Sequence, residues 1–382
     1  MRYGVNRYSI RDASALKIIY GPGSQFAKSS WYSSWTNPGS WSIFADQDIK
    51  RHARGRSLFQ STYSMSSMVH YEPFVDQGAD LFEQRLHEIA ERGTVVNMRH
   101  WFQCYAFDII GLITYGKRFG FLDEGEDIES LMSVLDGHLS YASLAGLTPS
   151  LHPLLFALRN WWGGKKGSGR GYLLRFTLQQ MREHQEDMAK AEDLEDHDGP
   201  QAFLSKFLSK YSEDPTKFTQ AHIVASCISN IVAGSDTTAI SLSAILYHLL
   251  RTRQCLERLR DEIDTFQSNG LLSDQPTFKE TQQMPYLQAV IKEALRMHPA
   301  TGLPLERVVP RGGIEIAGRL FPEGSIVGVN TWVEHRKPVM FGDDADVFRP
   351  ERWLIDDAET LSLMNRHFMP VSCGNRPLKF WG

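Results

Sequence analysis

The stretch TQAHIVASCISNIVAGSDTTAISLSAILYHLLR, residues 219–251, decides the fold class. It is apolar over almost its whole length, and at about 1.5 Å per residue such a helix spans on the order of 50 Å. We therefore expect it to cross the centre of a mainly helical protein. Thr219 precedes the apolar run and is a suitable N-cap. Four polar side chains argue against a membrane-spanning helix, because such groups are costly in hydrocarbon: Ser229, Asn230, Asp236 and Thr237.

The remaining chain also favours a mainly α fold with small β-sheets, in one domain over residues 1–382. Apolar spacing predicts two helices between Glu72 and Gly120, broken at Arg92–Gly93, and another helix over Pro285–Met297. Short β-type runs follow Pro304 (308–309, 314–316 and 326–329). Residues 163–169 and 186–200 have the composition of surface loops.

Composition excludes several classes of protein. The 382 residues are 42% hydrophobic and carry a net charge of −4 without a basic block, so we expect a large core and no nucleic-acid partner. The four cysteines form no CxxC pair, which favours a reducing compartment. The first residues, MRYGVNRYSIRDAS, show neither a signal peptide nor an anchor, so we expect no membrane span and a cytoplasmic location for the chain as written.

The long helix carries an unusual run, AGSDTT at 233–238. Gly costs about 1 kcal/mol inside a helix, and Ser, Asp and Thr compete for backbone hydrogen bonds, so we expect a local distortion that leaves one carbonyl free. An acid beside a hydroxyl in an apolar wall suits proton delivery to a buried reactant. A polar kink that merely seats a neighbouring helix is an equally good interpretation of this run alone.

Two later stretches contribute charged residues. Glu293 and Arg296 share one helix face, and Arg352 in PERW (350–353) can complete an ion network around Glu293. The chain closes with FMPVSCGNRPL (368–378), a glycine-containing loop with an arginine.

AGSDTT, EALR, PERW and FMPVSCGNR, in this order, resemble the cytochrome P450 superfamily over about residues 2–376. Residues 2–21 look like the first sheet of that family and the helix after it. Residues 315–353 look like its late sheet and meander. Fungal members that tailor secondary metabolites, pisatin-demethylase-like ones included, are the most similar in character.

The resemblance implies a haem b cofactor, a small lipophilic substrate and an NADPH-dependent reductase as electron donor. Asp236 and Thr237 would be the acid and alcohol that deliver protons to dioxygen, with Ala233 and Gly234 over the haem face. Three residues would form the structural ion network: Glu293, Arg296 and Arg352. Four would supply donors to the haem propionates, namely His52 and Arg56 in the positions of a WxxxR motif, Arg307 in LPLERVVP, and Arg376.

The sequence departs from the family at the haem ligand. Counting from Gly374 and Arg376, the position of the axial cysteine holds Leu378, which cannot ligate iron. Cys373 stands five residues earlier, where a small inert cysteine is the default interpretation. The resemblance also implies that the chain lacks both the anchor that fixes relatives to the endoplasmic reticulum and the helix after the ligand.

Two hypotheses follow from this departure. The first is a haem-dependent monooxygenase, and the second is a catalytically inactive, haem-free protein of the same fold. The metal ligand itself is not assigned by the sequence.

Overall fold

The computed structural model describes residues 1–162, 169–191 and 200–370. Contacts divide the chain into two compact units, each with its own core. Unit 1 consists of Met1–Ser29 and Ile240–Gly382, and unit 2 is Ser30–Ala239. The expectation of a single domain over residues 1–382 stays a prediction.

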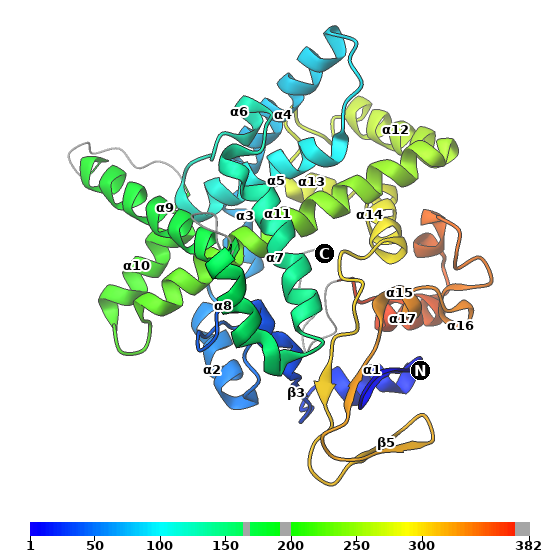
Figure 1. Ribbon diagram of the computed structural model, residues 1–382. Coiled ribbons are helices and arrows are strands. Elements are labelled where there is room, and N and C mark those ends of the chain that lie inside the picture. Colours follow the sequence, from blue (N-terminus) through cyan, green and yellow to red (C-terminus); the bar gives the residue numbers. More distant parts are fainter. Residues whose placement is uncertain (163–168, 192–199, 371–382) are drawn as a thin grey trace. The chain divides into compact units, whose positions relative to one another are not determined.

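Both units are mainly helical (Figure 1), and small sheets complete unit 1, which confirms the predicted class. Unit 2 is built from α2 (Ile49–Phe59), α3 (Met65–Val69), α4 (Glu72–Glu91), α5 (Met98–Tyr115), α6 (Phe121–Glu124), α7 (Leu131–Ala145), α8 (His152–Trp162), α9 (Gly169–Ala191), α10 (Phe203–Glu213) and the single-turn helices η1 (Ser30–Trp35), η2 (Ile128–Ser130) and η3 (Pro149–Leu151).

The two predicted helices of unit 2 are confirmed as α4 and α5. The break between them contains Gly93, whose φ of 63° suits glycine, and the Asn97 side chain caps α5 by accepting from the backbone N–H of His100. Gly116, with φ 75°, ends α5.

Unit 1 contains short and long helices around two sheets. Its helices are α1 (Ala13–Tyr20), α12 (Arg253–Ser268), α13 (Phe278–Thr281), α14 (Pro285–Met297), α15 (Thr331–Glu334), α16 (Pro338–Phe341), α17 (Ala358–His367) and η5 (Pro350–Leu354). Helix α14 has the predicted bounds. Proline is its first residue, where the missing N–H costs nothing.

One five-stranded sheet joins distant segments of unit 1. Its order is β1 (Arg2–Gly4), β2 (Arg7–Ser9), β7 (Ile326–Gly328), β4 (Arg307–Val308) and β3 (Ala27–Lys28). The pair β2–β7 is parallel, and the other pairs are antiparallel. A separate antiparallel hairpin holds β5 (Ile314–Ile316) and β6 (Arg319–Phe321). The predicted β runs after Pro304 are thus confirmed as β4, β5 and β7.

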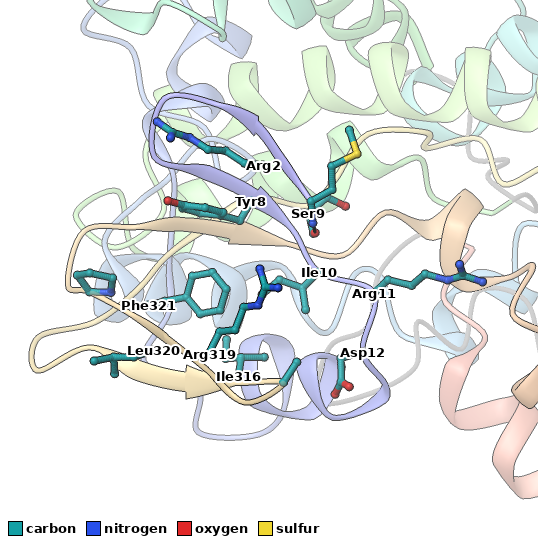
Figure 2. A pocket seen from close by; sticks show the side chains of 13 residues that line it. Arg2, Tyr8, Ser9, Ile10, Arg11, Asp12, Ile316, Arg319, Leu320 and Phe321 are labelled. Carbon is teal, nitrogen blue, oxygen red and sulfur yellow. Dashed lines mark hydrogen bonds between the residues drawn. The ribbon is translucent and has the colours of Figure 1, made fainter.

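A groove of about 400 Å³ lies in unit 1 between the end of β2 and the β5–β6 hairpin (Figure 2). Tyr8 and Phe321 meet edge to face at its wall, with ring centroids 5.3 Å apart. Its lining contains none of the site residues expected from the sequence.

Helix α11 (Gln220–Arg251) is the longest helix among the described residues. The predicted N-cap is present, since Thr219 Oγ1 accepts from the backbone N–H of His222 at 3.4 Å. By length and composition alone α11 is the one helix in the described part of the chain that could cross a membrane. Its buried Asn230 is hydrogen-bonded inside the core of unit 2, to Tyr63 and Thr114, as expected of a core helix.

Two expectations from the sequence differ from the structure, namely the loop at 186–200 and the opening of α11. Residues 186–191 are not loop, because α9 continues to Ala191; charged residues tolerate the exposed end of a helix as well as a loop. Residues 192–199 and 163–168 lie outside the described residues. The expected opening of α11 at AGSDTT is also wrong, because α11 stays helical there and the hydroxyl of Thr237 donates to the carbonyl of Ala233 at 2.6 Å.

Candidate functional site

The AGSDTT run lies in the unit 2 part of α11. Gly234 faces α5: a Cβ at this position would lie 2.9 Å from Ile110 Cδ1, so any larger residue would make Ile110 move. Ser235 is buried and its hydroxyl bonds back to the carbonyl of Ile231 at 2.6 Å. Ala233 and Thr237, one turn apart, are both exposed. One face of this turn is therefore fixed against α5, and another presents Ala233 and Thr237.

Asp236 is half-buried one position before Thr237. Burial raises the pKa of its carboxyl, the charge of Asp136 raises it further, and Arg99 opposes them. A carboxyl whose pKa is raised keeps its proton to a higher pH, so a larger fraction of molecules has a proton that can be passed to a neighbour.

His52 and Arg56 lie one turn apart on α2. His52 is half-buried and Arg56 is exposed. Between them, Gly55 packs against Trp41, where a Cβ would lie 3.0 Å from Cζ2. This spacing places the imidazole and the guanidinium on the same side of the helix, so both can face one anion.

Glu293 is the centre of a buried ion network in unit 1. Arg296 binds both of its carboxylate oxygens, at 2.8 and 2.7 Å, and Arg352 Nε donates to Oε1 at 2.9 Å. The indole of Trp353 donates to Oε2 at 2.9 Å. All three charged side chains are almost completely buried. The structure thus brings together the residues that the sequence grouped.

Most of the remaining guanidinium donors of this network bind backbone carbonyls, and Arg352 Nη1 also donates to the carboxylate of Asp344 at 3.0 Å. Arg296 Nη1 donates to the carbonyls of His335 at 2.7 Å and Ala345 at 2.6 Å, and Arg352 Nη2 donates to those of Asp344 and Val347, both at 3.1 Å. Two arginines therefore fasten the segment around 335–347 to α14, which is a structural rather than a chemical role.

His335 links this network to Met369, near the end of the described residues. Its Nδ1 lies 3.1 Å from the carbonyl of Arg296, and its Nε2 accepts from the backbone N–H of Met369 at 2.8 Å. Burial lowers the pKa of His335 to about 3, so the ring is neutral and can accept at Nε2. Sequence reasoning did not identify His335, because a single histidine carries no motif.

Arg307 belongs to β4, at the five-stranded sheet. It is half-buried, its Nη1 donates to the carbonyl of Glu306 at 2.9 Å, and its guanidinium lies over the Tyr20 ring at 5.3 Å. The neighbouring Glu306 is buried, pairs with Arg7 and accepts from the Tyr3 hydroxyl at 2.7 Å. This acid was also missed by sequence reasoning, although it ties β1 and β2 to the start of β4.

Cys373, Arg376 and Leu378 lie outside the described residues. Their identities are enough to test one point: leucine has no donor atom, so position 378 does not fit the axial site of a haem iron. The described residues contain three other cysteines, Cys104, Cys227 and Cys255. All three are buried in helices, and burial raises the pKa of their thiols.

Three features characterise this protein: a long helix that carries an acid beside an alcohol, a buried network of one glutamate and two arginines, and a small mixed sheet among many helices. The family model for cytochrome P450 matches residues 8–377, and the chain therefore belongs to the cytochrome P450 family.

Curated relatives agree with this membership. A cytochrome P450 monooxygenase of Aspergillus terreus is 35% identical over 98% of this chain and 77% of its own length. A pisatin demethylase of Fusarium vanettenii is 37% identical over 93% of this chain and 67% of its own length. The cytochrome P450 monooxygenase cicH of Emericella nidulans is 36% identical, over 96% and 73%. By family, the chain is a cytochrome P450 monooxygenase, and the family implies haem.

Proposed function

We propose that the protein works as a haem-dependent monooxygenase that inserts one atom of dioxygen into a small lipophilic compound of secondary metabolism. The observation that carries this proposal is the pair Asp236 and Thr237, an acid with a raised pKa beside a presented hydroxyl in a long apolar helix. Family membership and the fungal monooxygenases among the relatives support it. Electrons would come from an NADPH-dependent reductase.

In this proposal four residues of the AGSDTT run have distinct tasks. The Asp236 carboxyl holds and releases a proton, and the Thr237 hydroxyl, kept in place by the Ala233 carbonyl, orients the next donor. Gly234 keeps the turn against α5. His52, Arg56, Arg307 and Arg376 would offer cations to the haem propionates.

A second candidate function rests on Leu378. Without a thiolate at this position the chain would be a haem-free member of the fold that binds an apolar compound without oxidising it. The two candidates differ in one property that is easy to observe, which is the presence of pigment.

The experiment is a spectrum of the full chain, purified from cells supplied with haem precursor, after reduction under carbon monoxide. The monooxygenase predicts a strongly red-shifted Soret band. Complete absence of pigment would sink this proposal and leave the haem-free candidate. The variant Cys373→Ala serves as the control, because loss of the band in this variant would assign the thiolate to Cys373.

The variant Leu378→Cys tests position 378 directly. If this is the ligand position, Leu378→Cys in a Cys373→Ala background has a red-shifted Soret band of at least the wild-type intensity. A double variant whose spectrum equals that of Cys373→Ala alone would show that position 378 does not face the iron.

A further inference from the structure

Four basic side chains gather in unit 2 where α7, α8 and α9 approach η1. They are His138, His152, Arg159 and Arg170. Arg170 on α9 donates through Nη1 to the carbonyl of Trp35. The Trp35 ring lies 6.3 Å from the imidazole of His138 on α7. Arg159 on α8 donates to the carbonyl of Gly137 at 3.1 Å. Three helices thus bring two arginines and two histidines to one place.

No carboxylate of the described residues balances this cluster. Burial alone lowers the pKa of Arg170 to about 10. Burial lowers the pKa of His138 to about 3, and the charges of Arg170, Arg159 and His152 add to the effect. Asp136 is two positions from His138 and therefore about 200° around α7. A buried cation without a counter-charge is costly, so an anion is the missing partner.

The N-terminus of α9 adds to the positive potential. A Cβ on Gly169 would lie 2.9 Å from the carbonyl oxygen of Val134 and 3.5 Å from His138 Cβ, so the helix start lies directly against α7. The first N–H groups of a helix have no partners within it, and its dipole places positive charge at this end.

A second observation points to a ligand at the same place. His138 is only 4% exposed, yet its buried Nε2 has no hydrogen-bond partner among the described residues. Buried polar atoms are almost always satisfied, and an acceptor beside the α9 start would satisfy this one as an N–H donor.

The surroundings indicate what carries the negative charge. Trp35 belongs to a group of aromatic rings, with centroids 5.1 Å from Trp31 and 5.5 Å from Phe44, and Phe44 is 46% exposed. A mostly polar groove of about 480 Å³ borders the cluster at Thr36 and His152, and its lining also contains the Asp46–Arg51 pair. A volume of this size suits a small molecule, and the exposed ring of Phe44 beside Trp35 offers an aromatic ring a flat apolar face.

We infer that His138, Arg159 and Arg170, with the start of α9, bind the carboxylate of a small aromatic acid whose ring lies near Trp35 and Phe44. The planar fork of Arg170 matches a carboxylate in two parallel hydrogen bonds. This site is formed by residues of unit 2 alone and does not depend on haem, so it goes beyond the proposed function.

The test is a calorimetric titration of the full chain with benzoate near neutral pH, with the neutral amide benzamide for comparison. We expect benzoate to bind at least ten-fold more tightly than benzamide, and Arg170→Gln to weaken benzoate binding at least ten-fold. Arg175→Gln is the matched control, an exposed arginine on the same helix, and leaves binding unchanged. Equal binding of benzamide, full binding by Arg170→Gln or no binding by the wild type would each overturn the inference.

A thermal melt distinguishes a variant that folds but does not bind benzoate from a variant that does not fold. Benzoate should raise the melting temperature of the wild type and of Arg175→Gln, but not that of His138→Phe, which keeps a buried ring and loses the nitrogen. An equal rise in His138→Phe would contradict the role of His138. Inorganic phosphate is the other probe: a rise as large as that with benzoate would overturn the assignment to a carboxylate.

Discussion

Two groups of arginines in this protein have opposite surroundings. In unit 1, Arg296 and Arg352 share the carboxylate of Glu293, Arg352 also pairs with Asp344, and backbone carbonyls accept most of their other donors. In unit 2, Arg170 has the carbonyl of Trp35 and no carboxylate among the described residues. The first group is complete within the chain and holds the fold together. The second lacks its anion, which marks it as a place for a ligand rather than as a structural element.

The largest effect is expected where a matched network loses its anion. Glu293→Ala leaves Arg296 buried without a carboxylate, leaves Arg352 with Asp344 alone, and should cost about 3–5 kcal/mol of stability. The midpoint of urea unfolding measures this loss. Glu315→Ala removes an exposed carboxylate and should change stability by less than about 0.5 kcal/mol. Similar midpoints for the two variants would show that the network does not hold unit 1 together.

A smaller loss is expected when the charge stays and its geometry changes. Arg352→Lys keeps one positive charge, but lysine cannot reach Glu293 and the carbonyls of Asp344 and Val347 together. We expect a cost of about 2 kcal/mol in the same urea experiment. Arg258→Lys, at an exposed arginine, is the control. An unchanged midpoint for Arg352→Lys would mean that charge alone suffices.

The ion pair of Asp46 with Arg51 in unit 2 should make the stability of the protein depend on pH. Burial disfavours the charge of Asp46, but hydrogen bonds from Arg51, Trp41 and the backbone of Asp48 outweigh it and lower the pKa of Asp46 to about 2. Because this folded-state pKa lies below the unfolded value, the stabilisation is present above about pH 4 and disappears as the pH falls from 4 to 2.

We expect about 1 kcal/mol of this loss to be absent in Asp46→Asn, since Arg51 is exposed and solvent screens the pair. Unfolding midpoints of both proteins at several acid pH values measure the difference. Parallel pH curves would contradict the assignment to Asp46.

The sequence predicted the elements whose signal is local. Helix α14 and the bounds of α11 follow from apolar spacing, a proline at the first position and the Thr219 cap. The ion network around Glu293 was also predicted, because Glu293 and Arg296 share one helix face and Arg352 belongs to the PERW stretch of the family motifs. The departure at Leu378 was recognised from the resemblance, by counting along the family motif from Gly374 and Arg376.

What sequence could not predict depends on contacts between distant segments. His335, Glu306 and the cluster of His138 with Arg170 gain their roles only when helices and strands meet. A lone histidine or arginine has no readable signal before folding. The expected opening at AGSDTT was wrong for a related reason: the hydroxyl of Thr237 could bond back to a carbonyl of its own helix, and composition cannot choose between these outcomes.

The smallest expected change in stability is also the most direct test of the contrast between arginines with a carboxylate partner and the arginine without one. In ligand-free protein, Arg170→Met should keep the urea midpoint within about 1 kcal/mol of the wild type, or raise it, because it relieves an uncompensated charge. Arg296→Met should lower stability by about 3–5 kcal/mol. A loss in Arg170→Met as large as that in Arg296→Met would show that Arg170 is a structural residue with its needs already met, and would contradict the account.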